Sequence, residues 1–282
     1  MIHIGLAGWG DHDDLYAEGT RSKDKLSRYA AHFQVVECDS TFYAIPSQSV
    51  VERWIETVPE PFGYVVKAYQ GMTGHRTYKP YYESAKEMYQ AFVQMVAPIQ
   101  AAGKLSAVLM QVPPWFDCTR THVDILRRAR EWLQDLPVAL EFRHQSWFRD
   151  EMREKTLEFM REEQWIHSVC DEPQVSEGSI PIVLESTDDE MTIVRFHGRN
   201  ASGWVKQEDK DWREVRYLYQ YSEAELREWV DHVIWLEQHS KQVVVIFNNN
   251  SGGHAARNAK QFMELLGQHT APLAPRQISL FD

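Results

Sequence analysis

Charged side chains stand at the C-terminal ends of several short apolar runs, and these residues offer most of the chemistry in the sequence. The carboxyl groups of Glu37 and Glu141 can serve as general bases, and the imidazole of His197 as a general acid. Lys67 and Arg195 can hold negative charge on a substrate or a transition state. We therefore expect an acid–base site for an anionic ligand, with Glu37, Glu141 and His197 as the candidate catalytic residues.

The expected substrate-binding residues also end apolar runs. They are Trp9, Lys67, Gln111, Arg143, Arg195 and Asn248. Side chains alternate between the two faces of a strand, so residues two apart, such as Glu141 with Arg143 or Arg195 with His197, share one face. A charged side chain inside a strand is costly unless it is paired or used. The charged residues at the strand ends therefore form either a closed layer of ion pairs or a ligand site.

A metal ion is the alternative to a purely organic site. His197, Glu37, Glu141 and Asp171 include the donor types that transition metals take. The sequence has no paired histidine motif, and basic residues would stand among these ligands. We therefore predict no metal and no cofactor, with a divalent ion as the alternative.

The elements that must position these residues are eight apolar runs separated by helical patterns. The runs are Ile2–Trp9, Val35–Asp39, Tyr64–Tyr69, Leu105–Val112, Val138–Arg143, Ile166–Asp171, Thr192–His197 and Gln242–Asn248. The helical patterns, with apolar residues three and four apart, are Lys25–Phe33, Val50–Thr57, Ala85–Gln100, Thr121–Leu133, Glu151–Glu163, Ser222–His239 and Ala255–Leu266. Strands that alternate with helices eight times predict one α/β domain, a single (β/α)8 TIM barrel. Its site lies at the C-terminal ends of the strands.

Two segments depart from the regular alternation. Residues 172–189 contain Pro173, Gly178 and Pro181, so we expect an irregular sixth crossover without a helix. The long seventh loop, Gly198–Tyr221, is expected to carry short structure of its own. The barrel domain is predicted to span residues 1–269, and residues 270–282, with Pro272 and Pro275, to form an extended C-terminal tail.

Composition narrows the class of protein. The 282 residues are 43% hydrophobic, which is enough for a large core, and no run approaches a membrane-spanning length. The N-terminus shows no signal-peptide pattern, and three cysteines suit a reducing compartment, so a cytoplasmic protein without a membrane partner is expected. Cys38 and Cys170 are expected to face away from the polar row as inert thiols. The net charge of −11 disfavours non-specific binding to nucleic acid over the whole surface.

The loops at the predicted site end are more basic than the body. Loop three, residues 70–82, contains His75, Arg76 and Lys79 among several tyrosines and no acid. Arg199 and Trp204 begin the seventh loop, where Lys206 follows and no acid intervenes. This pattern predicts a mouth that binds an anionic small molecule or single-stranded nucleic acid stacked on aromatic rings. The alternative is that the aromatic side chains only plug the top of the barrel.

Several ordered motifs resemble the YecE-like family, a bacterial TIM-barrel family of domains of unknown function. They are residues 36–43 (VECDSTFY), 109–114 (LMQVPP), 140–144 (LEFRH), 194–199 (VRFHGR) and 247–249 (FNN). The resemblance runs nearly end to end. It implies the barrel and the pocket residues Glu37, Lys67, Glu141, Arg195, His197 and Asn248, and it implies no particular reaction. The first loop departs from the family's Trp- and Tyr-rich pattern.

The C-terminus carries a short peptide motif. Residues 277–281, QISLF, resemble the pentapeptide with which bacterial polymerases and repair proteins bind the DNA sliding clamp. Gln277 would enter a polar pocket, and Leu280 and Phe281 would be the apolar anchors. The sliding clamp is therefore an expected partner. The alternative is that the apolar residues of the tail pack on the barrel itself.

These observations leave three functions open. The first is a hydrolase- or lyase-type enzyme that acts on a phosphate-containing substrate, with nucleic acid among the candidates, and is tethered to the clamp. The second is a non-catalytic adaptor that binds nucleic acid or a small anion. The third is a carbohydrate or small-acid enzyme with paired carboxyl groups and an aromatic rim.

Overall fold

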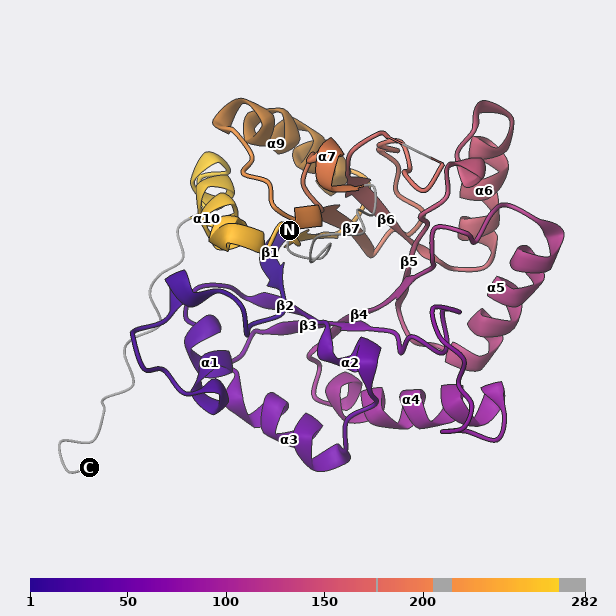
Figure 1. Cartoon of the computed structure of the whole chain (residues 1–282), viewed down its shortest axis with the longest axis horizontal. Coiled ribbons are helices and arrows are strands. Elements are labelled where there is room, and N and C mark those ends of the chain that lie inside the picture. The colour runs from indigo at the N-terminus through magenta and orange to yellow at the C-terminus, as the bar shows by residue number, and fades with distance from the viewer. Residues whose placement is uncertain (176, 205–214, 269–282) are drawn as a thin grey trace.

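The computed structural model describes residues 1–175, 177–204 and 215–268, and these form a closed barrel of eight parallel strands (Figure 1). The strands are paired in sequence order, and β8 closes on β1. They are β1 (Ile2–Ala7), β2 (Val35–Cys38), β3 (Gly63–Lys67), β4 (Leu105–Gln111), β5 (Val138–Glu141), β6 (Ile166–Asp171), β7 (Met191–Phe196) and β8 (Gln242–Phe247). The predicted (β/α)8 fold is confirmed.

Helices surround the barrel, as the sequence pattern predicts. They include α1 (Ser22–Tyr29), α3 (Gln48–Thr57), α4 (Ala85–Ala101), α5 (Arg120–Leu133), α6 (Asp150–Glu162), α9 (Glu223–Glu237) and α10 (His254–Leu265). Shorter pieces, α2 (Ser40–Tyr43) and α7 (Ala201–Trp204), follow β2 and β7 at the strand ends. The described part of the sixth crossover, residues 172–175 and 177–189, contains no helix, as expected.

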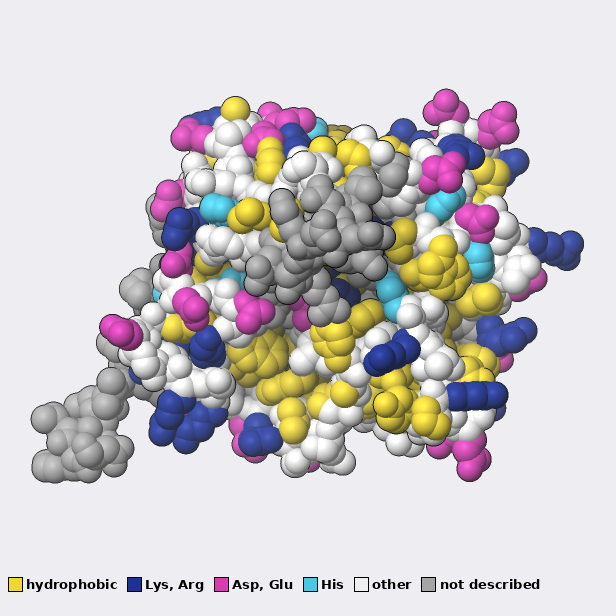
Figure 2. All heavy atoms as spheres, in the orientation of Figure 1, with side chains coloured by type: hydrophobic (Ala, Val, Ile, Leu, Met, Phe, Trp, Pro, Cys, Tyr) yellow, Lys and Arg dark blue, Asp and Glu magenta, His cyan; other side chains and the backbone are white. Residues whose placement is uncertain are grey.

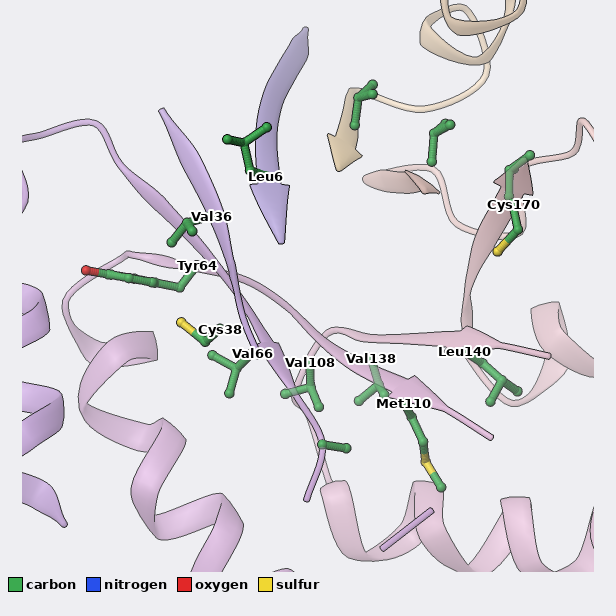
Figure 3. Packing of buried hydrophobic residues seen from close by; sticks show 14 of the residues in the cluster. Leu6, Val36, Cys38, Tyr64, Val66, Val108, Met110, Val138, Leu140 and Cys170 are labelled. Atoms are coloured by element: carbon green, nitrogen blue, oxygen red, sulfur yellow. The ribbon is translucent and has the colours of Figure 1, made fainter. Parts of the chain in front are cut away.

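The alternation of side chains along each strand separates two apolar layers. The barrel interior is filled by small and branched residues: Ala7, Val35, Val65, Ala107, Leu109, Ala139, Ile166, Met191, Ile193, Val244 and Ile246. The other strand face packs against the helices, and Figure 3 shows members of that larger layer, among them Leu6, Val66 and Leu140. Strands buried on both faces explain why their sequences are nearly continuous apolar runs.

The barrel closes tightly at its first strand. Gly5 is paired with Val35 of β2, and a Cβ atom on Gly5 would lie 2.1 Å from the backbone oxygen of Val35. Glycine is therefore needed for the close approach of β1 to β2. On the other side, the N-terminal amine of Met1 donates to the backbone oxygen of Lys241, which precedes β8.

Among the described residues, no helix is long and apolar enough to cross a membrane. The predicted tail of residues 270–282, with Gln277, Leu280 and Phe281, lies outside the described residues, as does Lys206 of the seventh loop.

Candidate functional site

Arg195 is the centre of the polar layer at the C-terminal end of the barrel interior. Its Nε and Nη2 donate to the two carboxylate oxygens of Glu37 at 2.9 and 2.6 Å. Its Nη1 donates to Oε2 of Glu141 at 2.6 Å. All three side chains are fully buried. Arg195 thus joins β2, β5 and β7 through a two-pronged ion pair and a second charged contact.

Glu141 of β5 accepts hydrogen bonds from side chains on three other strands or their ends, namely β4, β6 and β7. Gln111 Nε2 donates to Oε1 at 2.5 Å, and His197 Nε2 lies 3.2 Å from the same oxygen. Ser168 Oγ donates to Oε2 at 3.4 Å. On its other side, His197 Nδ1 lies 2.9 Å from Asn248 Nδ2. The amide must donate there, so the hydrogen of the neutral imidazole is on Nε2 and points at the Glu141 carboxylate.

A second group of charges lies above this layer. Lys67 Nζ donates to Asp39 Oδ1 at 3.0 Å and lies 3.9 Å from Glu37. Arg143 Nη1 lies 3.5 Å from Glu141, and its Nη2 lies 3.3 Å from Glu172. These basic side chains therefore connect the sealed layer below with the open end of the barrel.

Burial and charge move the titration of these groups in different directions. Burial raises the pKa of Glu37 to about 7, although Arg195 opposes the shift, and it raises the pKa of Glu172 to about 7 against Arg143. Burial would also raise the pKa of Glu141, but Arg195 and His197 together hold it well below its usual range. Burial lowers the pKa of His197 to about 3 despite Glu141. The lowered pKa favours the neutral imidazole of His197, in which Nε2 donates to Glu141, over the imidazolium form that the sequence analysis expected as the acid.

A cavity of about 660 Å³ opens above the charged layer. Its described lining includes Asp11, Asp39, Phe42, Tyr43, Lys67, His75, Gln111, Pro114, Arg143, Arg216, Tyr217, Asn248, Asn250 and Ser251. Figure 2 shows hydrophobic side chains gathered near α2, with many Asp and Glu side chains along the outline of this face. Four predicted binding residues, Lys67, Gln111, Arg143 and Asn248, line the cavity.

The predicted catalytic residues lie one layer deeper. Glu37, Glu141 and His197 are fully buried and do not appear in the cavity wall, and neither does Arg195. Gln111 and Lys67 stand in the wall and contact Glu141 and Glu37 from above. The charged residues at the strand ends thus form a sealed layer of ion pairs, and an open polar cavity lies above this layer.

Trp9 does not join the site. Its ring packs edge-on against Trp54 of α3, with the ring centroids 5.4 Å apart. Gly8, with φ of +74°, comes between β1 and Trp9 and breaks the strand alternation. The expectation that Trp9 faces the pocket was therefore wrong, because a left-handed residue turned the chain before it.

The expected orientation of β6 is reversed. Cys170 is paired with Arg195 across the sheet and shares its inward direction, whereas Asp171 points outward. Asp171 accepts from Arg199 Nη2 at 2.6 Å and from Trp229 Nε1 of α9. Asp171 is therefore no candidate metal ligand at the site, and Cys170 is not on the outward face.

The loops at the barrel mouth carry less uncompensated positive charge than their sequence indicated. Arg199 is held by Asp171 and by Glu225, which lies 3.3 Å away at the start of α9. The charge of Arg199 is thus compensated by acids distant in the sequence. Arg143 and Arg216 form a different basic group, because both guanidinium groups lie over the Trp204 ring, at 5.0 and 4.1 Å from its centroid.

Sequence reasoning missed Glu172, Arg216 and Tyr217. Glu172 directly follows β6, and its parity with Cys170 would have placed it inward once the register of β6 was known. Arg216 and Tyr217 come from the end of the seventh loop, and no local pattern in the sequence predicts that they line the cavity.

Within the described part of the chain, one set of side chains has donor atoms at metal-binding spacing. Glu141, Cys170 and His197 bring a carboxylate oxygen, a thiol sulfur and an imidazole nitrogen within 4.8 Å of one another. Arg195 Nη1 lies 2.6 Å from Glu141 and 3.4 Å from His197 Nε2. A divalent cation would stand beside this permanent positive charge, so the arrangement fits an arginine-centred network better than a metal centre.

The fold and the site together define a class of protein: a (β/α)8 barrel with a polar, basic cavity at the C-terminal ends of its strands. A family model described as "Protein of unknown function DUF72" matches residues 3–279. The chain belongs to this family.

Named relatives agree with this membership. The UPF0759 protein YunF of Bacillus subtilis is 52% identical over 282 residues, which cover 100% of both chains. The UPF0759 protein YecE of Escherichia coli is 28% identical over 161 residues, 56% of this chain and 54% of that protein. A crystal structure of a DUF72 family protein from Enterococcus faecalis superposes with a TM-score of 0.93 at 38% identity, covering 99% of this chain and 100% of that one. The YecE-like resemblance is confirmed.

Proposed function

We propose that the mouth of the barrel binds an anionic, phosphate-containing small molecule. The observation that supports it is the cavity itself: Lys67, Arg143 and Arg216 present three cationic groups to one space of about 660 Å³. Such a volume is typical of small-molecule sites. Arg143 is nearly fully buried, and a buried guanidinium is an effective partner for a phosphate or carboxylate.

The protonation of neighbouring carboxyl groups also favours an anionic ligand. Lys67 and Arg143 are accompanied by Glu37 and Glu172, whose pKa values burial raises to about 7. Near neutral pH these carboxyl groups take up protons readily, and each proton leaves the basic groups with a larger net positive charge. An incoming anion would therefore replace the negative charge that the protonated carboxyl groups give up.

Titration calorimetry with inorganic phosphate and a panel of phosphorylated metabolites tests this proposal. Lys67→Met and Arg143→Met should each weaken binding about ten-fold or more, since each removes a charged hydrogen bond. Arg227→Met is the matched control, because Arg227 is an exposed residue of α9 paired with Glu223. Equal affinities in the wild type and both cavity variants would overturn the proposal.

We propose further that the bound anion is a substrate for a hydrolase- or lyase-type reaction. Glu37 and Glu141 are the proton-transfer candidates, and they reach a ligand only when Lys67 or Gln111 moves aside. Glu141→Gln should abolish product formation while anion binding persists. Anion or nucleic-acid binding without any product, in the wild type as in the variant, would favour the non-catalytic adaptor instead.

The C-terminal motif supports a separate proposal, that the chain binds the bacterial sliding clamp through Gln277, Leu280 and Phe281. Binding of the full chain to purified clamp should be lost in a chain that ends at Pro275 and in Phe281→Ala. Glu264→Ala, in α10 outside the motif, is the control. Clamp binding that survives both tail variants, or is absent in the full chain, would contradict this proposal and leave the anion site untouched.

A further inference from the structure

The cavity at the barrel mouth has two walls with different chemistry. The wall that follows β3 and β5 carries Lys67 and Arg143, whose charged groups only donate hydrogen bonds. The wall that follows β8 and β1 consists of Asn248, Asn250, Ser251 and Asp11. In a ring of eight strands, β1 stands opposite β5. The second wall therefore faces Arg143 across the cavity.

The second wall presents mainly acceptors, because its amide donors are already used. Asn248 donates through Nδ2 to His197 at 2.9 Å, which leaves its Oδ1. Asn250 donates through Nδ2 to the backbone oxygen of Ala7 at 2.9 Å, and its Oδ1 is buried inside the wall, so this amide offers the cavity no free donor. The carboxylate of Asp11 can only accept. A ligand that reaches this wall must supply hydrogen-bond donors.

We infer that the ligand is an anion that also carries several hydroxyl groups, namely a sugar phosphate or a sugar acid. This inference rests on the proposed anion site. The charged group lies at Lys67 and Arg143, and the hydroxyl groups donate to Asp11 and Asn248. A carboxylate that faces two neighbouring hydroxyl groups accepts from both at once.

The neutral acceptors favour hydroxyl groups over an amine. An ammonium group would gain from Asp11, but the other groups of this wall are uncharged and would compensate poorly for its loss of water. The apolar part of the cavity, Phe42 and Tyr43 of α2, offers aromatic faces of the kind on which the C–H face of a sugar ring can pack. A site for inorganic phosphate alone would need neither feature.

The experiment compares full-length protein binding to ribose 5-phosphate, gluconate, butyl phosphate, aminoethyl phosphate and inorganic phosphate by titration calorimetry. We expect a polyhydroxylated anion to bind at least about ten-fold more tightly than butyl phosphate, the gain expected from one or two additional satisfied hydrogen bonds. Asp11→Ala should remove this difference, because it takes away the charged acceptor, and it should not weaken the binding of inorganic phosphate. Asp13→Ala is the matched control, because Asp13 lies in the same loop, is exposed and pairs with Lys25.

Each other outcome has a definite meaning. Equal affinity for butyl phosphate and ribose 5-phosphate would overturn the inference and leave the proposed anion site standing. Tightest binding of aminoethyl phosphate would replace the hydroxyl groups with an ammonium group. Failure of every anion would overturn the proposed function itself. A preference between gluconate and ribose 5-phosphate decides whether the ligand is a sugar acid or a sugar phosphate.

Discussion

At the scale of single residues, the molecule is organised around one guanidinium group that two carboxylates share. Arg195 is fully buried, and so are Glu37 and Glu141, which it contacts at 2.6 Å through Nη2 and Nη1 respectively. The desolvation of three charges is repaid only while all three remain together. Removal of the arginine leaves two acids in the barrel interior with no equivalent partner.

Arg195→Met should therefore be strongly destabilising, by about 3–5 kcal/mol at neutral pH, the cost typical of a buried charge left without its partner. The loss should be smaller at pH near 5, because the stranded carboxyl groups can then be protonated. Urea unfolding at both pH values measures the difference. Arg227→Met, at an exposed pair on α9, should change little. A loss of stability that does not depend on pH would show that packing, not charge, is the main role of Arg195.

Glu172 should give the protein a measurable pH dependence of stability. Its pKa in the folded chain, about 7, lies above the ordinary value of 4.5. Because the folded chain binds this proton more tightly than the unfolded chain does, protonated Glu172 contributes fully to stability below about pH 4.5. That contribution is lost as the pH rises from about 4.5 to about 7. The full loss is up to about 3 kcal/mol, since each pKa unit corresponds to about 1.4 kcal/mol.

Glu172→Gln, which keeps the shape and cannot ionise, should flatten the fall in unfolding free energy over this pH range. Chemical unfolding at half-unit pH steps is the measurement. Glu177→Gln is the control, because Glu177 is an exposed residue of the same crossover and pairs with Arg149. An unchanged slope in Glu172→Gln would mean that Arg143 keeps this acid ionised throughout.

The sequence could predict most of the charged cluster because strand parity is a local property. Glu141 with Arg143, and Arg195 with His197, follow from the period of two alone. Cys170 and Asp171 could not be assigned correctly, since the inward face of β6 depends on its register with β5, where Ile166 meets Ala139. Trp9 was misplaced for a different reason, the left-handed Gly8 that no alternation pattern includes.

At the scale of elements, the strands were easier to predict than the helix starts. All eight strands end within two residues of the predicted positions, because apolar residues stop where the polar layer begins. Helix α1 begins at Ser22, three residues before the predicted start, because its first turn is polar and carries no apolar period. The irregular sixth crossover was recognisable from its proline and glycine residues alone.

The contact between β1 and β2 predicts an unusually costly small substitution. Gly5→Ala places a methyl group 2.1 Å from the Val35 backbone oxygen, so the two strands must separate. We expect a loss of about 3 kcal/mol or more, at the upper end of what overpacking costs. Thermal unfolding compares it with Gly10→Ala, where an added Cβ meets nothing within 4 Å. Similar unfolding temperatures for the two variants would mean that the barrel widens at this seam without cost.

At the scale of the whole molecule, the net negative charge opposes the approach of the anionic ligand that we propose. The chain carries a net charge of −11, yet three cationic groups line one cavity. The acidic body repels an approaching anion over long range, while the cavity attracts it at short range. Salt screens exposed charges over distances beyond about 10 Å and affects contacts inside a cavity much less.

Anion affinity should therefore depend weakly on salt. Raising the ionic strength from about 0.05 M to about 0.5 M should change the Kd of a phosphorylated ligand less than ten-fold, because screening of the distant acids offsets part of the screening of the cavity cations. Titration calorimetry at a series of sodium chloride concentrations measures this change in Kd. A steep loss of affinity, of the kind that multiple phosphate contacts give, would instead indicate a nucleic-acid ligand on an exposed surface.

The pairing of β1 with β8 has a consequence for how the chain is made. One edge of β1 pairs with β2, but its other edge meets residues 243–247 only once β8 has been synthesised. Until then the sheet is open, and the free edge of β1 can be recognised by other chains. The newly made protein thus depends, for a short interval, on whatever shields β1 from its neighbours.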